Sequence, residues 1–495
     1  DTTESTGECY SASFLYSGGF HAQAEVDQFN QTRLVIGIDD YDFSWKLKKG
    51  ESFSTPEVCL TYSADGFSKL SQTLHQAIVS NLIRSCWKDR VRPILVNNWE
   101  ATYFDFNKDN LIAIAKEAAE LNLDMLVLDD GWFGKRDDDF SGLGDWFVNE
   151  KKLCGTLSEL VKEVHDMGLS FGLWFEPEMI SEDSDLYRAH PDWALVIPGR
   201  QPIRSRSQLV LDMSREDVTD YLTERICDIV EKADIQYIKW DMNRSLMAAY
   251  SAKLPRDRQG ELRHRYVLGL YKVLEAVTQR FPELLLEGCS GGGGRFDAGM
   301  LYYCPQIWCS DNTDAIERLR IQYGTSFGYP MSSVSAHVSV CPNHQNHRVT
   351  PFKTRGICAM QGTFGYELDL SKMTDEEKKM AGEQIAFFKE HGRLFQFGDY
   401  YRLTSPFENR DYTVWEYAAQ DGSEACMSVV YTDMYANAAS EIVKWKGLDP
   451  KKVYQMQLDG EDAGNFSGAA LMHAGILLPL PEQNYDAFQI YLKAE

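Results

Sequence analysis

The chain has 495 residues, of which 44% are hydrophobic and 25% are charged, as in a globular protein of two or three domains. Its formal net charge of −24 repels phosphate backbones and anionic lipid surfaces. No apolar run approaches the roughly 20 residues that span a bilayer. We therefore expect neither a nucleic-acid partner nor a membrane partner.

The 11 cysteines form an odd set without a CxxC pair, and several lie inside apolar runs. This pattern favours reduced, buried thiols and a cytoplasmic location over a disulfide framework. The glycosylation sequon at Asn243 to Ser245 lies inside a candidate site that a glycan would block, which also favours the cytoplasm.

The first part of the chain has the alternating pattern of β-strands, which we predict at residues 10–18, 32–38, 41–47 and 55–63. Four strands are few for a free-standing sandwich, because the missing partners would leave an exposed edge. The chain also begins with Asp1 rather than Met. We expect residues 1–88 to be the last part of a β-sandwich domain plus a linker, with more chain in front of it in the natural polypeptide.

Short apolar runs alternate with amphipathic helical stretches over residues 89–392, as in βα units around a parallel sheet. The strand candidates are residues 94–99, 125–132, 170–178, 209–214, 236–243, 284–292, 306–312 and 331–339. The helix candidates include residues 109–122, 156–168, 215–233 and 262–281, with caps such as Asp109 and Ser214. Eight such units over about 300 residues predict a (β/α)8 TIM barrel. A doubly wound open sheet is the alternative, and we disfavour it because no GxGxxG follows a first strand.

The strand pattern returns after the barrel, at residues 412–419, 424–433, 441–447 and 487–495. We therefore predict a small antiparallel β domain over residues 393–495.

The stretch IKWDMNR, residues 238–244, changes abruptly from an apolar strand to charged and polar residues. Active sites of TIM barrels lie at the carboxyl ends of the strands, so Lys239, Asp241 and Asn243 are placed at that rim. Lys239 and Asp241 are two residues apart and share a face, so we expect the cation to keep Asp241 ionised, as a nucleophile requires.

A second carboxyl group, Asp311, follows the strand candidate at residues 306–312, close to Trp308 and Cys309. Partial exclusion of water raises the pKa of a carboxyl group, which suits a proton donor. Two carboxyl groups in different environments are typical of glycoside hydrolysis. A single Asp at a strand end is more often a cap, so the prediction depends on several groups converging.

Other polar and aromatic residues end the neighbouring strand candidates. They are Asp129 and Asp130 in LDDGW, Trp174 and Glu176 in FGLWFEPE, and Arg206 before residues 209–214. Carboxylates accept hydrogen bonds from hydroxyl groups and cations donate to oxygens, so this set suits a polyol such as a sugar. An Asx turn at Gly131 is the simpler role for one of the two aspartates.

Two further motifs have weaker interpretations. The glycines of CSGGGGRFD, residues 289–297, lack the GKS or GKT ending of a phosphate loop and suggest a backbone that approaches a ligand closely. His337, His344 and His347 match no standard zinc spacing, so we expect no metal site.

Several long motifs resemble those of glycoside hydrolase family 36 α-galactosidases, in order from about Tyr41 to the end of the chain. They are RPILVNNWEATYFDF, LDDGWFG, GLWFEPEMIS, YIKWDMNR, EGCSGGGGRFD and WCSDNTDAIERL. The resemblance implies a retaining hydrolase that removes terminal α-linked galactose from oligosaccharides such as melibiose and raffinose, without a cofactor. In tetrameric relatives the full amino-terminal domain helps build the subunit contacts, and only its last part is predicted here, so a homo-oligomer of this chain stays open.

The resemblance also implies residue roles. Asp241 becomes the nucleophile and Asp311 the general acid and base. The residues placed around the galactose are Trp99, Asp129, Asp130, Trp174, Arg206, Lys239, Asn243, Cys289, Gly292 and Trp308. By this analogy Asp129 and Asp130 accept from the hydroxyl groups that distinguish galactose, and Cys289 with Gly292 lies near the 2-hydroxyl.

Three alternatives stay open on the sequence. A transglycosylase of the same fold would hand galactose to a sugar acceptor, and an α-N-acetylgalactosaminidase would need room beside the 2-position. A protein lacking its sandwich could also be an inactive carbohydrate-binding fragment.

Overall fold

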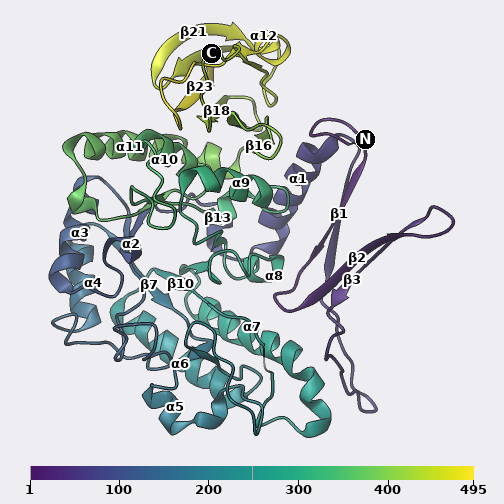
Figure 1. The fold of residues 1–495 in the computed structure, drawn as a ribbon, viewed down its shortest axis with the longest axis vertical. Helices are drawn as coiled ribbons and strands as arrows, with labels where there is room; N and C mark the ends of the chain where they lie inside the picture. The colour runs from purple at the N-terminus through teal and green to yellow at the C-terminus, as the bar shows by residue number, and fades with distance from the viewer. Residues whose placement is uncertain (1, 248) are drawn as a thin grey trace.

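The computed structural model describes residues 2–247 and 249–495, and it shows a central barrel with β structure at both ends of the chain (Figure 1). The amino-terminal strands form two antiparallel pairs: β1 (Cys9–Phe14) with β4 (Val58–Ser63), and β2 (Phe20–Val26) with β3 (Thr32–Ile38). The β2–β3 hairpin projects away from the barrel (Figure 1). Residues 41–47 form no strand, so that prediction is wrong, and β2 was not predicted.

Eight parallel strands form the barrel. They are β5 (Leu95–Asn97), β6 (Met125–Leu128), β7 (Ser170–Phe175), β10 (Tyr237–Trp240), β11 (Leu285–Gly288), β12 (Gln306–Trp308), an interrupted strand made of β13 (Val334–Ser335) and β14 (Val338–Ser339), and β15 (Gly365–Glu367). β13 pairs with β12, β14 pairs with β15, and β15 pairs with β5, so the sheet closes on itself. The predicted TIM barrel is confirmed.

Two of the eight strand assignments differ from the prediction. Residues 209–214 supply only β9 (Leu209–Val210), which pairs antiparallel with β8 (Met179–Ile180) outside the barrel, while β10 pairs directly with β7. The eighth strand is β15, which was not predicted. Both residues of β9 are buried, so their composition resembles that of a barrel strand, whereas β15 has only three residues.

Helices cover the outside of the barrel (Figure 1). The four predicted helices are confirmed as α3 (Lys108–Glu120), α4 (Leu157–Asp166), α6 (Glu216–Ala233) and α7 (Leu262–Arg280). Further helices are α1 (Gly66–Ala77), α9 (Ala315–Thr325), α10 (Phe352–Ala359) and α11 (Asp375–Phe397), with the short helices α2 (Trp99–Thr102), α5 (Asp185–Ala189), α8 (Ala298–Leu301) and α12 (Gly468–His473). The predicted caps are wrong, because Asn107 caps α3 and α6 begins after Arg215.

A six-stranded antiparallel sheet follows the barrel and contacts α10 and α11. Its strands, in spatial order, are β16 (Asp399–Arg402), β17 (Tyr412–Ala418), β18 (Glu424–Tyr431), β23 (Ala487–Ala494), β20 (Val453–Leu458) and β21 (Glu461–Ser467). The predicted strand at 441–447 contributes only β19 (Ile442–Val443), which pairs with β22 (Ile476–Leu477) in a separate ribbon. The carboxy-terminal antiparallel domain is confirmed.

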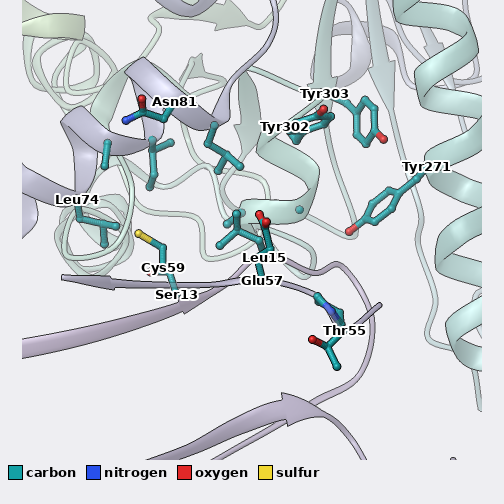
Figure 2. A pocket seen from close by; sticks show the side chains of 16 residues that line it. Ser13, Leu15, Thr55, Glu57, Cys59, Leu74, Asn81, Tyr271, Tyr302 and Tyr303 are labelled. Atoms are coloured by element: carbon teal, nitrogen blue, oxygen red, sulfur yellow. The ribbon is translucent and has the colours of Figure 1, made fainter. Parts of the chain in front are cut away.

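A large cavity lies between the amino-terminal strands and the barrel (Figure 2). It has a volume of about 570 Å³ and is lined by residues of β1, β4, α1 and α7, such as Ser13, Cys59, Leu74 and Tyr271. No residue of the predicted site lines it, so cavity size alone does not identify the site.

The cysteines and the helices bear on the predicted thiols and on membrane spans. All eleven cysteines are free within the part of the chain that the structure describes. No helix in residues 2–247 and 249–495 has both the length and the apolar character needed to cross a bilayer.

Candidate active site

The carboxyl ends of the barrel strands surround a small cavity of about 190 Å³. Predicted site residues that line it are Trp99, Asp129, Asp130, Trp174, Arg206, Lys239, Asp241, Asn243, Trp308 and Asp311. Its other lining residues, which sequence reasoning missed, are Glu100, Thr313, His344, Gln345 and Glu367. Cys289 and Gly292 are not among the lining residues. The two acids predicted to be catalytic therefore share one cavity.

Asp241 follows directly after β10 and is surrounded by hydrogen-bond donors. Its Oδ2 accepts from the indole nitrogen of Trp174 at 3.1 Å and from the amide nitrogen of Asn243 at 2.8 Å, and its Oδ1 accepts from the backbone N–H of Met242 at 2.9 Å. Three donors fix the orientation of this carboxyl group and match the acceptor-only character of an ionised carboxylate.

Lys239 has a different partner from the one that its spacing predicts. Its Nζ donates to Oδ2 of Asp129 at 2.8 Å, and both side chains are buried. Burial lowers the pKa of Lys239, but the attraction of Asp129 and of further anionic groups, Asp241 among them, outweighs it and raises the pKa well above its ordinary value. Lys239 therefore has Asp129 as its direct hydrogen-bond partner, while its charge also attracts Asp241. That Lys239 keeps Asp241 ionised stays a prediction.

The two adjacent aspartates after β6 are held in different ways. Asp129 also accepts from the amide of Asn97 at 2.7 Å, and its Oδ1 accepts from the backbone N–H of Asp130 at 2.9 Å. Asp130 forms a buried ion pair with Arg136 at 2.8 Å. Burial raises the pKa of Asp130, although the Arg136 guanidinium opposes that rise. Asp129 thus forms part of the cavity wall, and its contact with the N–H of the adjacent residue is not the two-residue contact of an Asx turn.

Asp311 lies on the loop after β12 and is open to the cavity. Its Oδ1 accepts from the indole nitrogen of Trp308 at 3.1 Å. Desolvation by the cavity walls raises the pKa of Asp311, and repulsion from Asp241 adds to the rise. The pKa of Asp311 is therefore raised, as predicted from its position close to Trp308.

The glycine loop after β11 packs against the loop of Asp311. Gly292 has a φ of +84°, and a Cβ atom at this position would lie 2.6 Å from the backbone nitrogen of Asp311. The N–H of Gly291 donates to Oδ1 of Asn243 at 2.9 Å. Cys289 is buried, with its thiol next to Asp241. The glycines therefore allow the loop after β11 to pack closely on the loop of Asp311. The predicted close approach of this backbone to a ligand stays a prediction.

We expect Gly292→Ala to lower kcat by about 10²-fold, because the new methyl group displaces the backbone of Asp311 from its position. A steady-state assay with thermal unfolding in parallel measures this. Gly382→Ala is the matched control, since a Cβ there meets nothing within 4 Å and activity should be unchanged. Full activity of Gly292→Ala would show that the two loops are not coupled.

Two buried glutamates, Glu100 and Glu367, line the same cavity as the predicted acids. Burial, followed by the charge of Glu367, raises the pKa of Glu100 to about 8. His344 lies 3.3 Å from Glu100, and His337 lies 3.2 Å from Glu367. These contacts give two of the three histidines considered for zinc a carboxylate partner each. Glu367 was missed because its strand, β15, was missed, and no local sequence signal marked Glu100.

Comparison with known families assigns all three parts of the chain. The family described as Melibiase matches residues 52–398. The glycosyl hydrolase family 36 N-terminal domain matches residues 1–48, and the family 36 C-terminal domain matches residues 412–492.

Similar proteins include the bifunctional α-galactosidase/sucrose kinase AgaSK of Mediterraneibacter gnavus, which is 54% identical over 99% of this chain and 51% of that protein. The α-galactosidase AgaA of Geobacillus stearothermophilus is 52% identical over 99% of this chain and 67% of that protein. The chain thus spans about half of one relative and two thirds of the other.

Solved structures of AgaA superpose closely on the whole chain. The structure of AgaA has a TM-score of 0.98 at 52% identity and covers 100% of this chain and 68% of that chain. A structure of an AgaA variant in complex with raffinose also has a TM-score of 0.98, at 51% identity, and covers the same shares. Together with the family matches, these similarities show that the chain belongs to glycosyl hydrolase family 36.

Proposed function

We propose that this protein is a retaining α-galactosidase that removes terminal α-linked galactose from oligosaccharides such as melibiose and raffinose. The observation that carries the proposal is the shared cavity, in which a carboxylate held by three donors and a carboxyl group with a raised pKa lie together. The relatives named α-galactosidases, and the AgaA structures in complex with raffinose and stachyose, support this substrate class.

The reaction has two displacement steps. In the first step Asp241 attacks the anomeric carbon and forms a carbon–oxygen bond, while the glycosidic bond breaks and Asp311 gives its proton to the departing oxygen. In the second step Asp311 takes a proton from a water molecule, which attacks the same carbon and releases Asp241. The hydrogen bonds to Asp241 hold its oxygens in position for the first step.

The remaining cavity residues bind the sugar in this proposal. Charged and amide groups for its hydroxyls come from Asp129, Asp130, Arg206, Lys239 and Asn243, and the aromatic walls come from Trp99, Trp174 and Trp308. Cys289 and Gly292 act from behind the cavity, by supporting the loops of Asp241 and Asp311. No cofactor enters either step.

We further propose that residues 89–392 are the catalytic unit, flanked by the β regions 1–88 and 393–495. The many free thiols, and the position of the Asn243 sequon in the cavity, favour a reducing cytoplasm. Apolar side chains on the β2–β3 hairpin, such as Phe20 and Leu34, are exposed, and a homo-oligomer, like further strands of the sandwich, would cover them. Nucleic-acid and membrane partners remain disfavoured by the net charge of −24.

The test of this proposal is hydrolysis of melibiose and of paired nitrophenyl α- and β-galactosides, with proton NMR of the first product. We expect cleavage of the α-linked substrates alone and initial release of α-galactose, because two inversions retain the configuration. Cleavage of the β-linked substrate, or initial release of β-galactose, would contradict the proposal.

A further inference from the structure

Arg206 reaches the cavity from a tight turn that has an unusual backbone. The turn runs from Ser205 to Gln208 and is closed by a hydrogen bond from the N–H of Gln208 to the carbonyl oxygen of Ser205 at 3.2 Å. Arg206 has a φ of 50° and Ser207 a φ of 61°. Two successive residues in the left-handed region form a turn that favours Asn-Gly, whereas here both residues carry other side chains. Such a conformation persists only where the surrounding structure enforces it.

Arg244 supplies one part of that support. Its Nη1 donates to the carbonyl oxygens of Ile203 and Gln208, each at 2.8 Å, so the guanidinium joins the segment before the turn to the last residue of the turn. The Arg244 side chain is buried. Its Nη1 thus holds Ile203 and Gln208 at a fixed separation on the two sides of Arg206.

Glu176 supplies the other part and connects the turn to the nucleophile. Its Oε1 accepts from the side-chain amide of Gln208 at 2.6 Å and from the backbone N–H of Asn243 at 2.6 Å. Asn243 in turn donates to Asp241 at 2.8 Å. Burial, followed by repulsion from Asp241, raises the pKa of Glu176 to about 8. One carboxyl oxygen therefore binds both the Arg206 turn and the loop of the nucleophile.

We propose that Arg244 and Glu176 are positioning residues that fix the strained Arg206 turn to the loop of the nucleophile. The guanidinium of Arg206 then contacts the bound sugar at a fixed position relative to Asp241. This inference rests on the proposed function, in which Arg206 contacts the galactoside. Neither Arg244 nor Glu176 lines the cavity, so both act through other residues.

The first test is Arg244→Met, which keeps an apolar stem and removes the two hydrogen bonds to the turn. We expect KM for nitrophenyl α-galactoside to rise about 10- to 100-fold, as for the loss of one charged hydrogen bond to the substrate, with a smaller change in kcat. Arg263→Met is the matched control, because Arg263 also donates to a backbone carbonyl, that of Leu246 at 2.9 Å, but makes no contact with the turn. Its KM should stay within about twofold of wild type.

The second test addresses the strain itself. Ser207→Gly in the Arg244→Met background should recover most of the lost affinity, because glycine adopts a positive φ without steric cost. Ser207→Val, with Arg244 intact, should raise KM like Arg244→Met, because a β-branched side chain opposes that conformation. This variant keeps the test valid if Arg244→Met fails to fold.

Four results separate the outcomes. An unchanged KM in both Arg244→Met and Ser207→Val would overturn the inference, as would failure of Ser207→Gly to recover affinity in folded protein. A wild-type protein that does not hydrolyse α-galactosides would contradict the proposed function instead. The same variants are then compared by calorimetric binding of galactose, and equal affinity of Arg244→Met and wild type would overturn the inference.

Discussion

We expect Asp241→Ala to lower turnover of nitrophenyl α-galactoside by at least about 10⁴-fold, because it removes the atom that bonds to the anomeric carbon. In this variant the hydrogen-bond donors of Trp174, Asn243 and Met242 would surround a space about the size of one carboxyl group. Steady-state kinetics with parallel thermal unfolding measures the loss.

Added azide provides the internal control for this variant. A small anion that enters the space left by the carboxylate attacks the anomeric carbon once, so azide should restore turnover and give β-galactosyl azide. A misfolded protein could not be restored in this way. Ordinary turnover in Asp241→Ala without azide would show that another group is the nucleophile.

The second large effect is expected for Asp311→Ala, and it depends on the leaving group. Hydrolysis of melibiose should fall by about 10²- to 10⁴-fold, because the departing sugar oxygen needs a proton. The first step with a nitrophenyl substrate should change little, since nitrophenolate leaves without one. Pre-steady-state release of nitrophenol, set beside melibiose turnover, measures the difference. Equal losses on both substrates would contradict the role of proton donor.

The pH dependence tests the same residue. Partial burial and the charge of Asp241 raise the pKa of Asp311, so the carboxyl group keeps its proton to higher pH than a free aspartate. Wild-type activity on melibiose should therefore fall as pH rises through this raised pKa, because the proton for the leaving oxygen is lost. Asp311→Ala should lack that dependence in the first step with nitrophenyl substrates.

The sequence predicted the barrel because long helices such as α6 and α7 have helical periodicity, and buried strands such as β6 and β7 are short continuous apolar runs between them. In the barrel region it failed at two very short elements. The three residues of β15 show no period, and the two residues of β9 are apolar but lie outside the barrel. Length alone does not explain the outcome, because the seven-residue β2 was missed and the three-residue β12 was predicted.

Asp241, Asp311 and most other charged candidates followed from one topological rule, that functional groups gather at the carboxyl ends of barrel strands. The roles of Trp99, Cys289 and Gly292 came from the family resemblance alone. The rule predicts where a side chain lies, but it does not predict which group that side chain contacts. Lys239 and Asp241 share a face of one strand, yet inward side chains from alternate barrel strands meet in layers, and Lys239 reaches Asp129 beyond β6 instead. Sequence spacing likewise could not show that Gly292 packs on the backbone of Asp311, because that contact joins two loops.

Trapping of the covalent intermediate tests the central claim most directly. The protein would be incubated with a fluorinated α-galactoside whose second step is slow, and its peptides would then be analysed by mass spectrometry. The account predicts one added fluorogalactosyl group on the peptide that contains Asp241, and none in Asp241→Ala. Label on another carboxyl group, or steady product release with inverted configuration and no label, would contradict it.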